Sequence, residues 1–163
     1  MEGMQEILDS LKQSPTVLAA FVGAIPASKL DVRRGEGFWT IAEHVSHLAQ
    51  VQPMLLERIQ RFIEQERPEF VPYIPGEGDE GPGTPARMEM AAALAQFRSV
   101  RERQLALLAR VADPVWQRQA VHPEYEQYSL TILARHILMH DYWHMYRMEE
   151  LWLTRAAYLT ALT

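Results

Sequence analysis

The chain has 163 residues, a formal net charge of −5 and no cysteine. This length suits one domain, so we expect residues 1–163 to form a single domain. Without cysteine, disulfides and thiolate ligands are excluded, and a reducing cytoplasm is the expected location. The acidic balance and the lack of a long basic run argue against nucleic-acid binding. We expect no membrane segment, because no apolar run approaches the length needed to span a bilayer.

Hydrophobic spacing predicts helices along most of the chain. The first begins near Met4. Ser14-Pro15 is typical of an N-cap followed by a proline at the first helical position, so we expect a break there. A second piece then runs from Pro15 to about Ile25, and residues 27–39 form a connection.

The next helix has a clear predicted start, because Thr40 and Glu43 have the spacing of a capping box. Pro53 lies inside the apolar pattern that follows, where it is expected to kink or divide the helix. The helix should end near Arg67-Pro68. The apolar stripe consists of Ile41, Val45, Leu48, Leu55, Ile59, Phe62 and Ile63.

Residues 68–84 are rich in glycine and proline and predict a long loop. Thr84-Pro85 predicts the start of a third helix that runs to about Val111. Ser129 or Leu130 opens the last helix, which passes Leu151. The sequence therefore predicts an all-α fold: a four-helix bundle, up-down with one long crossover loop.

Three of the six histidines fall on the last predicted helix with a spacing of four: His136, His140 and His144. Residues at this spacing line one helix face, so two of these imidazoles could bind one ion without distorting the backbone. The alternative is that they are core residues. A third ligand would come from a neighbouring helix, which offers His44 and His47. Periodicity alone favours His44, because it lies nearer the centre of the apolar stripe.

Two segments resemble a known family. Residues 39–48 read Trp-Thr-Ile-Ala-Glu-His-Val-Ser-His-Leu, and residues 140–144 read His-Asp-Tyr-Trp-His. Together they are similar to the motifs of the DinB/YfiT-like superfamily of metal-binding four-helix bundles. The resemblance implies that His47, His140 and His144 hold a divalent metal ion. His44 and His136 then become near neighbours of the site.

Three imidazoles suit zinc, nickel or iron(II), and they leave coordination positions open for water or substrate. Glu43 is either an acceptor for an imidazole N–H or only the carboxylate of the capping box. Asp141 is expected to be a solvated helix residue. Several other side chains could contact an anionic substrate or line a pocket, although surface or core roles are at least as expected: Arg33, Arg34, Arg135, Arg147, Trp39, Trp143 and Tyr142.

The resemblance implies a metal-dependent enzyme, either an S-transferase that uses a low-molecular-weight thiol or a hydrolase, with an unknown small-molecule substrate. The alternatives are a non-enzymatic metal-binding or stress-response protein, and a purely structural bundle. No catalytic residue is assigned. We also expect a homodimer, because apolar residues surround much of the last helix: Leu133, Leu138, Met139, Met145, Leu151 and Trp152.

Overall fold

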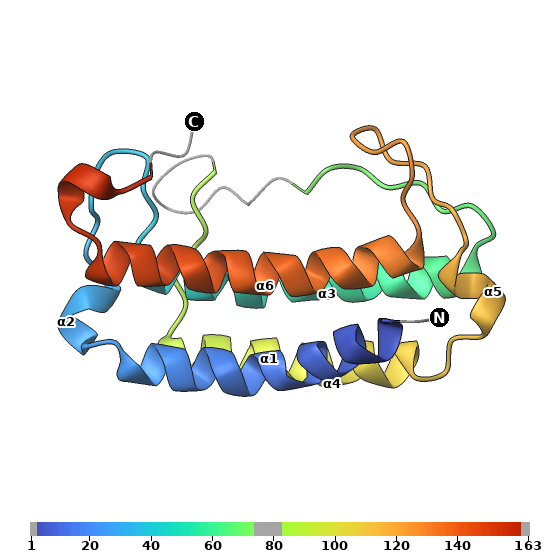
Figure 1. The fold of residues 1–163 in the computed structure, drawn as a ribbon, viewed down its shortest axis with the longest axis horizontal. Helices are drawn as coiled ribbons and strands as arrows, with labels where there is room; N and C mark the ends of the chain where they lie inside the picture. The colour runs from blue at the N-terminus through green and yellow to red at the C-terminus, as the bar shows by residue number, and fades with distance from the viewer. Residues whose placement is uncertain (1–2, 74–82, 161–163) are drawn as a thin grey trace.

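Four long helices form a bundle in the computed structural model, which describes residues 3–73 and 83–160 (Figure 1). The long helices are α1 (Met4–Ala24), α3 (Ile41–Glu64), α4 (Met90–Leu108) and α6 (Leu130–Leu153). The short elements are α2 (Ala27–Leu30), α5 (Asp113–Trp116) and the 3-10 helix η1 (Ala156–Tyr158). The predicted all-α four-helix bundle is confirmed. None of the described helices is long and apolar enough to cross a membrane.

Each long helix packs against two others: α3 contacts α4 and α6, and α1 contacts the same two helices from the opposite side. The connection between α3 and α4 spans residues 65–89, of which 74–82 lie outside the described residues. It returns the chain to the end of the bundle where α3 begins, so α3 and α4 run in the same direction (Figure 1). This connection is the predicted crossover.

The predicted break at Ser14-Pro15 is wrong, because α1 continues through Pro15. A proline inside a helix leaves the carbonyl four residues earlier without its N–H partner. Here the Ser14 hydroxyl donates to that carbonyl, Leu11 O, at 3.1 Å. Ser14 is therefore not an N-cap, and its side chain replaces the backbone hydrogen bond that Pro15 cannot make.

Pro53 likewise does not divide α3. The carbonyl that it leaves without a backbone partner belongs to Ala49, and the Gln96 side chain of α4 donates to it at 3.0 Å. The helix ends at Glu64, three residues before the predicted Arg67. A side chain from the neighbouring helix thus lets a proline lie within α3.

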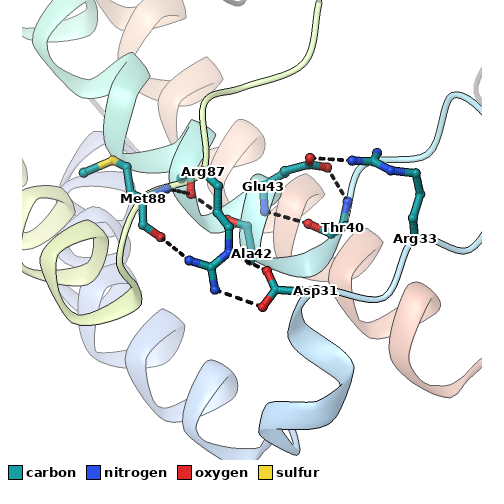
Figure 2. Close-up of polar contacts among 8 residues, drawn as sticks. Asp31, Arg33, Thr40, Ala42, Glu43, Arg87 and Met88 are labelled. Carbon is teal, nitrogen blue, oxygen red and sulfur yellow. Dashed lines mark hydrogen bonds and ion pairs between the residues drawn. The ribbon is translucent and has the colours of Figure 1, made fainter. Parts of the chain in front are cut away.

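A network of polar contacts fixes the start of α3 (Figure 2). Thr40 Oγ1 accepts from Glu43 N at 3.1 Å, and Glu43 Oε2 accepts from Thr40 N at 2.7 Å, which is the predicted capping box. Arg33 Nη2 donates to the other oxygen, Glu43 Oε1, at 2.6 Å. The carboxylate of Glu43 therefore takes part in both the capping box and an ion pair.

The third long helix starts later than predicted, at Met90 rather than near Thr84-Pro85. Its N-cap is Glu89, whose carboxylate accepts from the backbone N–H groups of Ala91 and Ala92 at 3.0 and 2.8 Å. The segment before it is held along α3 instead, because Met88 N donates to Ser46 Oγ at 2.8 Å. The helix also ends earlier than expected, at Leu108.

The core consists of two apolar clusters, one around Leu11, Ile59 and Ile137 and the other around Leu18, Phe97 and Met148. Buried polar side chains lie between the two clusters along the helices: Ser14, Gln52, Arg101, Gln104 and Asp141.

The expectation that Asp141 is solvated is wrong. Asp141 is 0% exposed, and its Oδ2 lies 2.8 Å from Arg101 Nη1. Arg101 also donates to Ser14 Oγ and Gln52 Oε1, each at 3.2 Å. Asp141 lies on a face of α6 that points into the bundle, where it pairs with the buried Arg101 of α4.

Candidate metal centre

Three histidine rings from two helices meet on one side of the bundle. His47 Nε2 of α3 lies 3.2 Å from His140 Nε2 of α6, and His144 Nε2 lies 3.1 Å from the same His140 atom. One ring nitrogen from each residue falls within 4.8 Å of the other two. The structure therefore brings together the three side chains that the resemblance selected.

Local structure explains this convergence. His140 and His144 are one turn apart on α6, so their rings project from the same face. His47 lies in the second turn of α3, one turn after the capping-box residue Glu43, and α3 packs directly against α6. The cap fixes where α3 begins, and the helix–helix contact sets the distance between the rings.

The spacing and chemistry of this cluster fit a metal ion. In a tetrahedral site with bonds of about 2.0–2.1 Å, neighbouring ligand nitrogens lie roughly 3.3 Å apart, close to the two distances above. Each of the three residues contributes its Nε2 atom, and the cluster contains only imidazole nitrogens. Neutral nitrogen ligands of this kind suit a divalent cation, so the cluster suggests a metal site.

Burial keeps these rings neutral. It lowers the pKa of His47 to about 3 and that of His140 to about 4, with smaller contributions from His140 and from Arg101, respectively. Burial is also the main reason why the pKa of His144 lies far below its ordinary value. Neutral imidazoles keep a lone pair free, which is the form that binds metals.

His44 lies behind this cluster rather than in it. Its Nδ1 is 2.8 Å from His144 Nδ1, so the two rings share a hydrogen bond on the side of His144 that faces away from the other two ligand candidates. His44 is 1% exposed, and burial lowers its pKa to about 3. The apolar periodicity of α3 pointed to His44 because it is the more deeply buried of the two histidines.

The cluster opens into a pocket of about 480 Å³. Trp39 packs at its near end, with its ring centroid 5.1 Å from that of His47. Trp143 is 47% exposed and meets the His144 ring edge-on at 4.7 Å. Both tryptophans therefore line the pocket, whereas Tyr142 is exposed on α6 outside it. Val51, Met54, Leu55, Leu133 and Ile137 supply apolar walls.

The far end of the pocket contains polar groups that sequence reasoning did not select. Arg58 lies there on α3, together with Tyr128 and His122, and His136 lies beside them. The His136 ring centroid is 5.8 Å from that of Tyr128, so His136 belongs to this aromatic group and not to the three-ring cluster. Arg58 is eleven residues from His47, too far along the helix for a local motif to connect them.

The other basic candidates have structural partners. Arg34 donates to the carbonyls of Leu151 and Thr154 at 2.5 and 2.9 Å. Arg147 is buried against Glu150 and the ring of Phe38. Arg135 is exposed on α6 and does not line the pocket. Arg34 and Arg147 therefore hold the connections near the C-terminal end of α6, and Arg135 lies on its surface.

Both the sequence and the fold of this chain are similar to those of known proteins. Residues 10–148 match the DinB superfamily. The fold is similar to that of YfiT from Bacillus subtilis, described as a probable metal-dependent hydrolase with an unusual four-helix bundle topology. That match has 24% sequence identity and a TM-score of 0.79, and it covers 93% of this chain and 86% of YfiT. No curated protein matches the sequence.

Proposed function

Since the chain belongs to the DinB superfamily, we propose that it is a metal-dependent enzyme in which His47, His140 and His144 bind one divalent ion. The observation that carries this proposal is the convergence of three neutral imidazole nitrogens at the end of an apolar pocket. Zinc, nickel and iron(II) all suit such ligands. A divalent ion held by three imidazoles supplies Lewis acidity at its open positions and lowers the pKa of a small nucleophile that binds there.

The proposed reaction is the activation of a small nucleophile toward an electrophilic substrate. The nucleophile is water if the enzyme is a hydrolase, as YfiT is described, or a low-molecular-weight thiol if it is an S-transferase. The pocket supports an enzyme over a protein that only stores metal, because storage needs no cavity beside the ligands. About 480 Å³ is within the range of small-molecule sites.

Residues of the chain itself would orient the substrate. The ring of Tyr73 lies 5.9 Å from that of His47, and burial raises the pKa of the Tyr73 phenol. The phenol is therefore protonated at neutral pH and can donate a hydrogen bond to a substrate oxygen. Trp39 and Trp143 flank the rings and would exclude water from one side of the reacting group.

Metal content tests the first part of the proposal. Protein purified without a nickel column should contain about one equivalent of a divalent metal by elemental analysis. The His47→Ala variant should fall to trace levels, whereas His122→Ala, which changes another histidine of the same pocket, should keep the metal. Trace metal in the wild type even after incubation with zinc, nickel and iron(II) would overturn the proposal.

Turnover tests the second part. Metal-loaded protein is assayed for ester, amide and phosphoester hydrolysis, and for thiol consumption against a panel of electrophiles with each low-molecular-weight thiol. Activity should appear in one series and disappear in His47→Ala. A protein that binds metal tightly but turns over nothing in either series would favour the non-enzymatic alternative.

A further inference from the structure

The pocket has a second polar end, on the side opposite the three-ring cluster. Arg58 and His47 are separated by eleven residues of α3, which corresponds to roughly 16 Å of helix axis. The surface between them is mainly apolar, with Val51, Met54 and Leu55 on α3. A ligand that reaches from one end to the other must therefore have an apolar body and a polar group at its far end.

Arg58 carries a charge that no other residue in the described part of the chain neutralises through an ion pair. Its Nη2 donates to the carbonyl of Val71 at 2.5 Å, and its Nη1 lies 3.4 Å from Tyr128 Oη. Its guanidinium carbon lies 5.2 Å from the centre of the Phe70 ring. Among the described residues, no carboxylate lies within ion-pair distance of Arg58, and a half-buried guanidinium is stabilised by an anionic partner.

The two neighbours of Arg58 are also hydrogen-bond donors. Tyr128 is 3% exposed, and burial raises the pKa of its phenol, which therefore keeps its proton. His122 Nδ1 accepts from the backbone N–H of Glu124 at 3.2 Å. In the neutral ring the proton then lies on Nε2, which is a donor. Burial lowers the pKa of His122, with a smaller contribution from Arg58, so the neutral form prevails at neutral pH.

From this juxtaposition we propose that Arg58, Tyr128 and His122 form a subsite for a carboxylate, and that the substrate is an apolar or aromatic carboxylic acid. Its carboxylate lies at the Arg58 end, and its reacting group lies at the three-ring cluster. The placement of the reacting group rests on the proposed function, whereas carboxylate binding at Arg58 does not.

Within residues 3–73 and 83–160, Glu124 is the one acidic side chain that lines the pocket. It is exposed and makes no ion pair with Arg58. Its charge opposes an incoming anion without neutralising the guanidinium. Glu124→Gln should therefore tighten the binding of a carboxylate and leave the binding of an uncharged analogue unchanged.

The test uses metal-free protein, so that a carboxylate cannot bind to a metal ion. Phenylacetate, 4-phenylbutyrate and 6-phenylhexanoate are titrated by calorimetry beside their primary amides. Charge-assisted hydrogen bonds predict that the acids bind about tenfold to hundredfold more tightly than the amides. Arg58→Gln should abolish this preference, Tyr128→Phe should reduce it, and Arg58→Lys should keep most of it.

Arg61→Gln is the matched control. Arg61 lies one turn further along α3, contacts the same Phe70 ring at 5.0 Å and donates to Glu69 O at 2.6 Å, but it does not line the pocket. It should keep the full preference for acids, and circular dichroism confirms that each variant is folded. Equal affinity for acids and amides in the wild type, no binding of either series, or an unchanged preference in folded Arg58→Gln would each overturn the inference.

His47→Ala separates this inference from the proposed function. The variant should lose the metal and keep the preference for acids in the metal-free titration. A protein that binds no metal but prefers acids through Arg58 would contradict the proposed function alone. A protein that binds metal at the three rings but does not distinguish acids from amides would contradict only the carboxylate subsite.

Discussion

His44 Nδ1 lies 2.8 Å from His144 Nδ1, and both rings are almost completely buried. A neutral imidazole that uses Nε2 as a metal ligand carries its proton on Nδ1. His144 would then donate this proton to the lone pair of His44 Nδ1. The hydrogen bond therefore sets both the tautomer and the orientation of His144, which is the role that outer-sphere partners play for metal-binding histidines.

His44→Ala should weaken metal binding without abolishing it. Loss of an outer-sphere partner typically lowers metal affinity about tenfold to hundredfold, because the ligand ring loses its fixed tautomer. Competition titration of zinc with a chromophoric chelator measures the change. His136→Ala, at the far end of the pocket, should have no effect on the affinity. Equal zinc affinity in His44→Ala and the wild type would show that the hydrogen bond is not needed for the site.

Glu43→Gln should leave metal affinity unchanged, because both oxygens of this carboxylate are used by Thr40 and Arg33 rather than by an imidazole. The expected effect is on stability. Loss of the ion pair and weakening of the capping box should lower the free energy of unfolding by about 1 kcal/mol. Chelator competition and urea denaturation distinguish the two effects, and a large loss of zinc affinity would contradict this assignment.

Metal-free protein should lose stability as the pH falls from about 6.5 to about 4. Burial lowers the pKa of His44 and of His47 to about 3, and that of His140 to about 4. The unfolded chain takes up protons on these rings near pH 6.5, whereas the folded chain does not until the pH reaches their lowered values. Each ring therefore contributes to the loss, by up to about 1 kcal/mol per pH unit where it is protonated in the unfolded chain and neutral in the folded chain.

Urea denaturation in the presence of a chelator, at intervals between pH 4 and pH 8, measures this dependence. His47→Gln removes one of the titrating rings and should make the loss of stability with falling pH less steep. A midpoint of unfolding that stays constant from pH 7 to pH 5 would mean that these rings are protonated in the folded protein as well.

The sequence predicted the elements whose signals are local. The capping box at Thr40 and the spacing of His140 and His144 each depend on residues within one or two turns, and the structure contains both. The choice of His47 over His44 came from family resemblance, because the helical wheel reports depth of burial and His44 is the deeper residue. The helical wheel alone would have selected His44, the hydrogen-bond partner of His144, instead of His47.

Two of the errors share a physical cause, which is contact between helices. Pro53 did not divide α3, where Gln96 of α4 donates to the carbonyl that the proline leaves free, whereas at Pro15 the free carbonyl accepts from Ser14 of the same helix. Asp141 was expected in solvent because its buried partner, Arg101, is 40 residues away in the sequence. Tertiary partners of this kind override local propensity, and one sequence does not reveal them.

We propose that two copies of the chain associate through the outer face of α6. Half of the apolar residues that suggested a dimer are in the core, namely Leu133, Met145 and Leu151, but Met139 and Tyr146 are 51% and 72% exposed. Tyr146→Glu should shift the protein from dimer to monomer in sedimentation velocity. Tyr158→Glu, which changes an exposed tyrosine beyond the C-terminal end of α6, should not. A monomeric wild type at high concentration would contradict the proposal.

Breaking the buried ion pair of Arg101 and Asp141 should lower the free energy of unfolding much more than replacing both residues with apolar ones. Removing one partner leaves an uncompensated charge in the core, so Asp141→Asn should lower the free energy of unfolding by about 3–5 kcal/mol. Replacing both partners, as in Arg101→Met with Asp141→Leu, removes both charges and should cost much less. Urea denaturation of the two variants at pH 7 compares them. If the double variant is at least as destabilised as Asp141→Asn, the network that includes Ser14 and Gln52 stabilises the bundle beyond charge compensation, and the pair cannot be treated as an isolated ion pair.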